Sequence, residues 1–187
     1  MNSFNMTSSL KYPFCLLLTT LVLSMSYTHA HITTKNNDND DLITTMCHET
    51  IAPSICETDI RSDPRRSKPD KKTVVLIIID VTRSQFLEAL TYTKNVTESA
   101  HDPGMIRALN KCIEIYNFVV DVSSRSAIAG IETGQPKYAY DAMKDAADEA
   151  AACLKAFPDN PPVPFVDRTR ALKQTSAIAV KLVELVM

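Results

Sequence analysis

The stretch that decides the fold lies at residues 74–81 and reads Val74-Val75-Leu76-Ile77-Ile78-Ile79-Asp80-Val81. Seven of its eight residues are apolar and six of those are β-branched, which taken alone favours a buried strand. One helical face nevertheless continues through and beyond this stretch, formed by Val75, Ile78, Ile79, Thr82, Phe86, Leu90 and Thr93. We therefore predict a helix over residues 70–98.

The composition supports a helical reading of that stretch. The chain has 187 residues but only three glycines, too few for the turns of a many-stranded protein or for a glycine-rich phosphate loop. No second strand is therefore expected to pair with residues 74–81. The 20 basic and 22 acidic residues give a net charge of −2 without a long basic block, which argues against nucleic acid as a partner. We expect an all-α chain.

Three further segments carry apolar residues at helical spacing, at residues 104–127, 136–156 and 168–186. The proline-rich stretch 158–164 separates the last two. Before the first long helix, residues 42–61 form two short amphipathic pieces broken near Pro53, and residues 62–69 form a loop. The pattern predicts an up-down-up-down four-helix bundle preceded by a small helical hairpin.

The first 30 residues have the features of a cleaved secretory signal. Lys11 precedes an apolar stretch from Phe14 to Leu23, and the small-residue site Thr28-His29-Ala30 follows. The stretch is too short for a membrane-spanning helix. We expect a signal peptide over residues 1–30, a flexible polar start over 31–41 and a domain over 42–187, with no membrane association after cleavage.

Loss of Cys15 with the signal leaves an even number of cysteines, namely Cys47, Cys56, Cys112 and Cys153. In a secreted protein we expect two disulfides. Four cysteines allow three pairings, and the sequence alone does not choose among them. The local spacing of Cys47 and Cys56 favours a stapled hairpin, and Cys112 would then pair with Cys153. The cysteines lack the CxxC spacing and nearby histidine pairs of a metal site.

A search for catalytic groups predicts no catalytic residue, no metal and no cofactor. None of the histidines that remain, His31, His48 and His101, lies in a nucleophile motif. Glu98 and His101 spell the Glu-x-x-His of di-iron bundles, but no second copy accompanies them. Acidic residues fall mainly on polar helix faces, where solvation explains them: Glu114, Asp141, Asp145, Asp148 and Glu149. We expect a protein that is not an enzyme.

Asn95-Val96-Thr97 fits the acceptor pattern for an N-linked glycan in a secreted chain. It falls late in a predicted helix rather than in a loop. Asn95 is therefore a candidate glycosylation site.

The chain resembles the plant invertase inhibitor / pectin methylesterase inhibitor family over about residues 40 to 187. The resemblance rests on the signal peptide, the Cys47-x8-Cys56 hairpin, the alanine-rich segment from Ala139 to Cys153 and the string Ala108-Leu109-Asn110-Lys111-Cys112-Ile113-Glu114-Ile115-Tyr116. It implies the pairings Cys47 with Cys56 and Cys112 with Cys153. Members of this family inhibit either acid invertases or pectin methylesterases.

One segment discriminates between these two targets. Residues 133–138 include Pro136-Lys137-Tyr138, which is similar to the Pro-Lys-Phe motif of the invertase-directed branch, with tyrosine in place of phenylalanine. Proline fits a helix start, and lysine projects a cation beside an aromatic ring. Invertases are retaining glycosidases with an acidic pair in the cleft, where a lysine could form charge-assisted bonds. The alternative is an ordinary first-turn proline and a solvated lysine.

The sequence thus predicts a secreted inhibitor of plant acid invertase (β-fructofuranosidase) that docks on the enzyme's active-site cleft as a monomer. The location expected for it is the apoplast or cell wall, with the vacuole as the alternative. Inhibition of pectin methylesterase through the bundle's helix surfaces is the second hypothesis. A disulfide-stapled carrier of a small apolar ligand is a third, and it would need an interior cavity.

Overall fold

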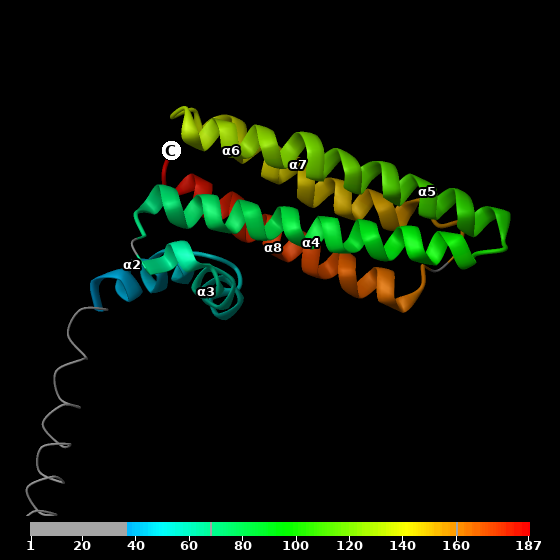
Figure 1. Ribbon diagram of the computed structural model, residues 1–187, viewed down its shortest axis with the longest axis horizontal. Coiled ribbons are helices and arrows are strands. Elements are labelled where there is room, and N and C mark those ends of the chain that lie inside the picture. Colours follow the sequence, from blue (N-terminus) through cyan, green and yellow to red (C-terminus); the bar gives the residue numbers. More distant parts are fainter. Residues whose placement is uncertain (1–36, 68, 160) are drawn as a thin grey trace, which may run out of the picture. The chain divides into compact units, whose positions relative to one another are not determined.

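The computed structural model describes residues 37–67, 69–159 and 161–187, and residues 39–187 form one compact unit. The expected signal peptide and most of the expected flexible start lie outside the described residues. Within those residues every regular element is a helix, in agreement with the predicted all-α class. The order of elements gives four long helical runs, which the short helices α2 and α3 precede. The long runs lie side by side (Figure 1).

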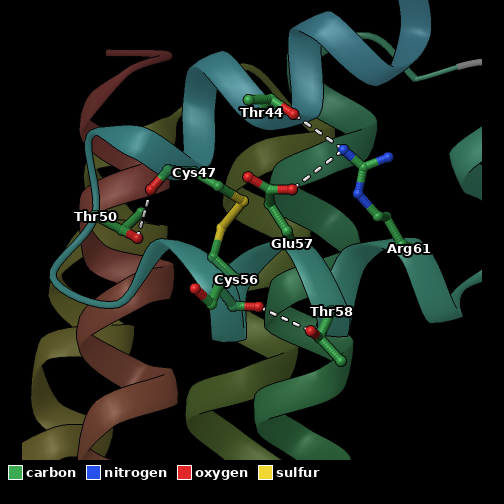
Figure 2. Close-up of a disulfide and its surroundings, with 8 residues drawn as sticks. Thr44, Cys47, Thr50, Cys56, Glu57, Thr58 and Arg61 are labelled. Atoms are coloured by element: carbon green, nitrogen blue, oxygen red, sulfur yellow. Dashed lines mark hydrogen bonds and ion pairs between the residues drawn. A yellow bond between two sulfur atoms is a disulfide. The ribbon is translucent and has the colours of Figure 1, made fainter.

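The N-terminal hairpin consists of α2 (Asn37–His48) and α3 (Pro53–Ser62). Helix α2 begins at Asn37, earlier than the predicted start at Leu42. The prediction was late because the first turn is polar and carries no apolar stripe. The sulfurs of Cys47 and Cys56 are bonded (Figure 2). Both residues are buried. Thr50 Oγ1 donates to the Cys47 carbonyl at 2.7 Å and so ties the connecting turn to α2.

A second set of contacts joins the two hairpin helices at the Arg61 side chain. Arg61 Nη2 donates to Thr44 Oγ1 at 2.9 Å and to Glu57 Oε2 at 3.2 Å (Figure 2). Because Thr44 belongs to α2 and Arg61 to α3, the guanidinium crosses from one helix to the other. The hairpin is therefore held by a disulfide and by polar contacts of Arg61, which meet α2 about one helical turn apart.

The strand-like stretch 74–81 lies in α4 (Lys71–Ser99), so the predicted helix is confirmed. Asp70 caps it, since an Asp70 Oδ1 oxygen accepts from the Thr73 N–H at 2.7 Å. Hydrogen bonding with the Thr73 side chain, and then with its backbone N–H, holds the pKa of Asp70 below its usual value. Helix α4 contacts α3 as well as α5, α6 and α8. Burial on several sides explains why the stretch is apolar almost without interruption.

The second long run is α5 (Pro103–Phe118), a π-helical segment η2 (Val119–Ser123) and α6 (Ser124–Glu132). The expected end at residue 127 is therefore too early. In the π segment the Ser124 N–H and Oγ both reach the Val119 carbonyl, and Arg83 Nε of α4 donates to the Val120 carbonyl at 3.1 Å. Side chains thus satisfy the carbonyls that the wider turn displaces.

The last two long helices are α7 (Pro136–Lys155) and α8 (Val163–Glu184). Helix α8 begins five residues before the expected start at 168. Two of the prolines that indicated a loop, Pro162 and Pro164, occupy its N-cap and first turn, where proline's missing N–H costs nothing. Phe157 and Phe165, one on each side of the connection, have ring centroids 5.3 Å apart and close the loop against the bundle.

The second disulfide joins Cys112 of α5 to Cys153 of α7 in the core. Tyr116 lies beside it, with its hydroxyl 3.1 Å from Cys153 Sγ, and its ring meets Phe86 of α4 edge-on at 5.7 Å. Burial raises the pKa of Tyr116. Three of the four long runs therefore meet around one covalent link.

Candidate functional site

The start of α7 carries the predicted triplet Pro136-Lys137-Tyr138, and a tight turn sets its position. The Gln135 N–H donates to the Gly130 carbonyl at 2.7 Å, and the Gly134 N–H donates to the Ile131 carbonyl at 3.4 Å. This pair of bonds is a Schellman motif, which ends α6 with a residue in the left-handed conformation. Gly134 is that residue, with φ of 73°. The chain reverses direction within three residues.

Gly130 is needed for the close approach of α6 to α7. A Cβ at this position would lie 3.0 Å from the Gln135 carbonyl oxygen and 3.1 Å from the Ala139 nitrogen. Both of these are backbone atoms, which cannot rotate away as a flexible side chain could. Two of the chain's three glycines therefore define the turn that presents the triplet. This was not recognised from the sequence, although two glycines just before the triplet were visible there.

The triplet projects two exposed side chains from the first turn of α7. Pro136 occupies the start of the helix and is half-buried, whereas the side chain of Lys137 is 65% exposed and Tyr138 is 59% exposed. Alanine 139, the next residue, is fully buried and anchors the turn to the core. The geometry thus holds the backbone firmly and leaves a cation and an aromatic ring in solvent.

Two neighbours on the same helix contact the Lys137 ammonium. Its Nζ forms an ion pair with the Asp141 carboxylate and lies 4.9 Å from the centroid of the Tyr140 ring. These residues follow Lys137 by four and three positions, so they share its helix face. Sequence reasoning treated Asp141 only as a solvated acid and gave Tyr140 no role. The spacing of the three residues was the signal that could have found this cluster.

A hollow of about 270 Å³ adjoins the triplet. It is open to solvent, and its lining comes from four parts of the chain: Lys72, Ile131, Gly134, Pro136, Val186 and Met187. Lys72 Nζ donates to the Glu132 carbonyl at 3.2 Å, so the start of α4 lies at the same end of the bundle as the α6–α7 turn. The triplet therefore lies at the rim of a shallow depression at one end of the bundle.

A second exposed feature lies midway along the α5–α6 run and was not predicted. Phe118 directly precedes the π-helical segment and is 48% exposed, and Val122 lies within that segment and is 50% exposed. Apolar side chains with this exposure on adjacent turns form a small patch. The widened turn that displays them leaves no trace in the hydrophobic pattern, so the sequence did not reveal it.

The remaining sequence candidates lie apart from this site. Glu98 and His101 are both exposed around the end of α4. Over the described part of the chain, no cluster of three or more His, Cys, Asp or Glu side chains is arranged to bind a metal ion. Within residues 37–67, 69–159 and 161–187, no helix is both long enough and apolar enough to cross a membrane. Asn95 is exposed on α4, near its C-terminal end.

The string Ala108 to Tyr116, which carried the family resemblance, contributes one buried face to the core. Ala108, Leu109, Cys112 and Tyr116 are each at most 1% exposed. These residues pack the bundle and hold the second disulfide, so they specify the fold. They do not form a surface that a partner could contact.

Comparisons with known proteins agree with this resemblance. The chain is 28% identical over 137 residues to the cell wall / vacuolar inhibitor of fructosidase 1 of Arabidopsis thaliana, covering 73% of this chain and 65% of that protein. It is 27% identical over 123 residues to the pectinesterase inhibitor of Actinidia deliciosa, covering 66% of each. The chain thus spans just under two thirds of the length of these curated relatives.

Solved structures show the same fold. A pectin methylesterase inhibitor from Arabidopsis thaliana matches 79% of this chain and 97% of its own with a TM-score of 0.58 at 18% identity. The mutant form A of a pectin methylesterase inhibitor from Arabidopsis matches 76% of this chain and 95% of its own, with a TM-score of 0.64 at 17% identity. The family model for plant invertase/pectin methylesterase inhibitors matches residues 41–183, and the chain therefore belongs to this family of inhibitor proteins rather than of enzymes.

Proposed function

We propose that this protein inhibits a plant acid invertase by docking the first turn of α7 on the enzyme's active-site cleft. The observation that carries the proposal is the exposed Lys137 cation, held between a helix-starting proline and the exposed ring of Tyr138. A retaining glycosidase holds two carboxyl groups in its cleft. An ammonium group placed between them forms charge-assisted hydrogen bonds and excludes the sugar substrate.

The rigid turn before α7 favours this role over a merely solvated lysine. Binding costs less when the contacting segment is already held in its bound conformation. The Schellman motif, the close approach at Gly130 and the buried Ala139 fix the backbone on both sides of Lys137. Only the lysine and tyrosine side chains need to reorient on docking. In addition, a cation in a first turn opposes the helix dipole, so the fold itself gains little from Lys137.

The buried core residues do not distinguish invertase from pectin methylesterase as the target. The two curated relatives differ in target by name, yet their identities to this chain are nearly equal. The buried residues of the string Ala108 to Tyr116 pack the bundle. The triplet, with its exposed Lys137 and Tyr138, is therefore the feature that favours invertase. We place the protein in the apoplast or cell wall, with the vacuole as alternative, acting as a monomer; the two disulfides suit such an oxidising compartment.

The test is an inhibition assay of the purified protein against both an acid invertase and a pectin methylesterase. We expect inhibition of invertase, and we expect Lys137→Ala to weaken it by about 2 to 5 kcal/mol, roughly 30-fold to several thousand-fold, as when one partner of a buried ion pair is removed. Lys137→Glu is expected to be worse, because it places like charges together. The melting temperature stays unchanged, since Lys137 is exposed.

Lys144→Ala is the matched control, because Lys144 is an exposed lysine two turns further along α7. It should leave inhibition unchanged. If Lys137→Ala inhibits invertase as well as the parent does, the triplet is not the contact site. If the parent inhibits only pectin methylesterase, the target is wrong.

The second candidate, inhibition of pectin methylesterase through the helix surfaces, has one specific observation in its favour. Phe118 and Val122 present an exposed apolar patch beside the π-helical segment of the bundle. Under this hypothesis Phe118→Ala should abolish inhibition of pectin methylesterase. Under the first hypothesis the same variant should still inhibit invertase. The carrier hypothesis gains no support from the hollow beside Pro136, which is open to solvent.

A further inference from the structure

A shallow groove lies on the α4–α8 face of the bundle, around the candidate acceptor Asn95. It has a volume of about 500 Å³ and is open to solvent. One residue of α8 and five residues of α4 line it: Arg168, Leu87, Glu88, Thr91, Tyr92 and Asn95. Asn95 is thus itself part of the groove wall, and a group attached to its side chain would begin inside the groove.

Helical spacing aligns the groove with the acceptor. Leu87, Thr91 and Asn95 follow one another at intervals of four residues, so they form one row along α4. Tyr92 precedes Asn95 by three residues and lies on the neighbouring row. The row gives the Asn95 side chain a continuous floor running back along its own helix.

The lining combines apolar surface with polar groups. Leu87 is 47% exposed, so its side chain offers apolar surface to the groove. The Arg168 guanidinium lies 4.1 Å from the centroid of the Tyr92 ring. Glu88 adds a carboxylate. A sugar residue has an apolar face that packs on leucine and tyrosine and hydroxyl groups that pair with carboxylate and guanidinium, so the groove matches the chemistry of a saccharide.

We propose that Asn95 carries an N-linked glycan whose first sugars lie in this groove over Leu87 and Tyr92. The two disulfides indicate folding in the oxidising secretory compartment, where such glycans are attached. The donor is a lipid-pyrophosphate-linked oligosaccharide. Asn95 Nδ2 forms a bond to the anomeric carbon, the bond from that carbon to the pyrophosphate oxygen breaks, the lipid pyrophosphate leaves, and Nδ2 loses one proton.

The folded helix sets the order of events. Thr97 Oγ1, the hydroxyl of the acceptor pattern, donates to the Thr93 carbonyl at 2.8 Å and is half-buried. In folded α4 this hydroxyl is therefore engaged within the helix. Glycan transfer precedes the folding of this part of α4, and the attached sugars then settle on the groove as the helix forms.

The glycan leaves the start of α7 accessible. Lys72, which lies at the α6–α7 end of the bundle, precedes Asn95 by 23 residues of one helix, which corresponds to about 35 Å. A glycan at Asn95 covers the far end of the α4–α8 face and does not obstruct Lys137. The proposal is therefore compatible with the proposed function but does not depend on it.

The test compares the full chain secreted from a eukaryotic host with the Asn95→Gln and Thr97→Ala variants. Intact mass should show a saccharide increment on the parent that an N-glycan-releasing enzyme removes, and neither variant should carry it. Thr97→Ser is the matched control, because it keeps the acceptor pattern and should keep the glycan. Tyrosine nitration then reports the groove: Tyr92 should react several-fold more slowly in the parent than in Asn95→Gln.

Tyr138 is the internal reference for the nitration experiment, because it is exposed at the other end of the bundle and should react equally in both proteins. A parent without the mass increment overturns the assignment of the site. A parent that carries the glycan but whose Tyr92 reacts as fast as in Asn95→Gln overturns the placement of the sugars in the groove. Neither result bears on invertase inhibition, which is measured separately.

Discussion

The two ends of α7 serve different purposes. Its first turn holds Lys137 and Tyr138 in solvent, and a glycine-dependent turn precedes it. Its last turns bury Cys153 against Cys112 and Tyr116 of α5. The C-terminal end of α7 therefore contributes stability, and the N-terminal end presents the candidate contact. One helix can do both because the bundle needs only part of its surface.

The largest effect expected from this comparison lies at the buried end. Replacing Cys112 and Cys153 together by serine opens a loop of 41 residues' separation, which should lower the free energy of unfolding by about 4 kcal/mol in the chain-entropy model. Thermal unfolding should show a large fall in the melting temperature. Inhibition measured well below that temperature should stay near the parent value.

The matched control is the double serine variant at Cys47 and Cys56, which opens a shorter loop of 9 residues' separation and should cost about 3 kcal/mol. If removing the Cys112–Cys153 disulfide abolishes inhibition while the protein is still folded, the two ends of α7 are not independent.

The next effect concerns the turn before α7. Gly130→Ala places a Cβ against the Gln135 carbonyl and the Ala139 nitrogen, and overpacking of this kind costs about 1 to 3 kcal/mol. Because the backbone must shift to relieve it, inhibition should weaken together with stability. Denaturant unfolding and inhibition assays measure the two.

Gly134→Ala is the comparison variant, because it strains the same turn without a steric clash. Nothing lies within 4 Å of the added Cβ, and the cost comes from the φ of 73°. The substitution should reduce stability by about 1 kcal/mol. If Gly130→Ala loses stability without any loss of inhibition, the position of the turn does not matter for docking.

The sequence predicted the long helices because their apolar stripes persist over many turns. Residues 74–81 could be predicted as helical despite their strand-like composition, since the apolar stripe continues beyond them to Thr93. The prediction placed the end of the second run too early because the π-helical segment and Gly130 interrupt the usual signs of a helix. It placed the start of α8 too late because the prolines there also fit a loop.

For the candidate site, the sequence supplied the triplet but not its surroundings. Pro136, Lys137 and Tyr138 are adjacent in the chain, so a motif reveals them. The hollow beside them combines residues from α4, α6 and the C-terminal segment, and only the fold brings those together. Whether Asp141 is merely solvated or is paired with Lys137 depends on side-chain conformations, which spacing permits but does not fix.

A smaller effect is expected at the start of α4, which lies at the same end of the bundle as the start of α7. Asp70→Ala removes the side chain that accepts from the Thr73 N–H and should cost about 1 kcal/mol of stability near neutral pH. Inhibition should not change. This variant therefore tests whether any weakening at this end of the bundle affects docking, or only changes at α7.

The pH dependence of that loss follows from the lowered pKa of Asp70 in the folded state. The unfolded state binds the proton more readily, so the stabilisation is fully present above the ordinary value of 3.8 and is lost as the pH falls through the lower folded value. Unfolding curves of parent and variant should converge in strong acid. Curves that stay equally separated at low pH would show that the cap does not act through its charge.

The smallest effect concerns Asp141, which pairs with Lys137 on the surface of α7. If Lys137 enters an acidic cleft it must leave Asp141, and Asp141 is then brought toward carboxylates of like charge. An exposed pair at this spacing is worth about 0.3 to 0.5 kcal/mol. Asp141→Asn should therefore tighten inhibition of invertase by about two- to threefold, since it removes both the competition and the repulsion. The gain should shrink at high salt, because exposed charges are screened.

Asp145→Asn, one turn further along the helix, is the control and should have less effect. In the background of Lys137→Ala the substitution should lose most of its benefit, because no lysine remains to be released. Weaker inhibition by Asp141→Asn would mean the opposite, that Asp141 holds Lys137 in the orientation that docks.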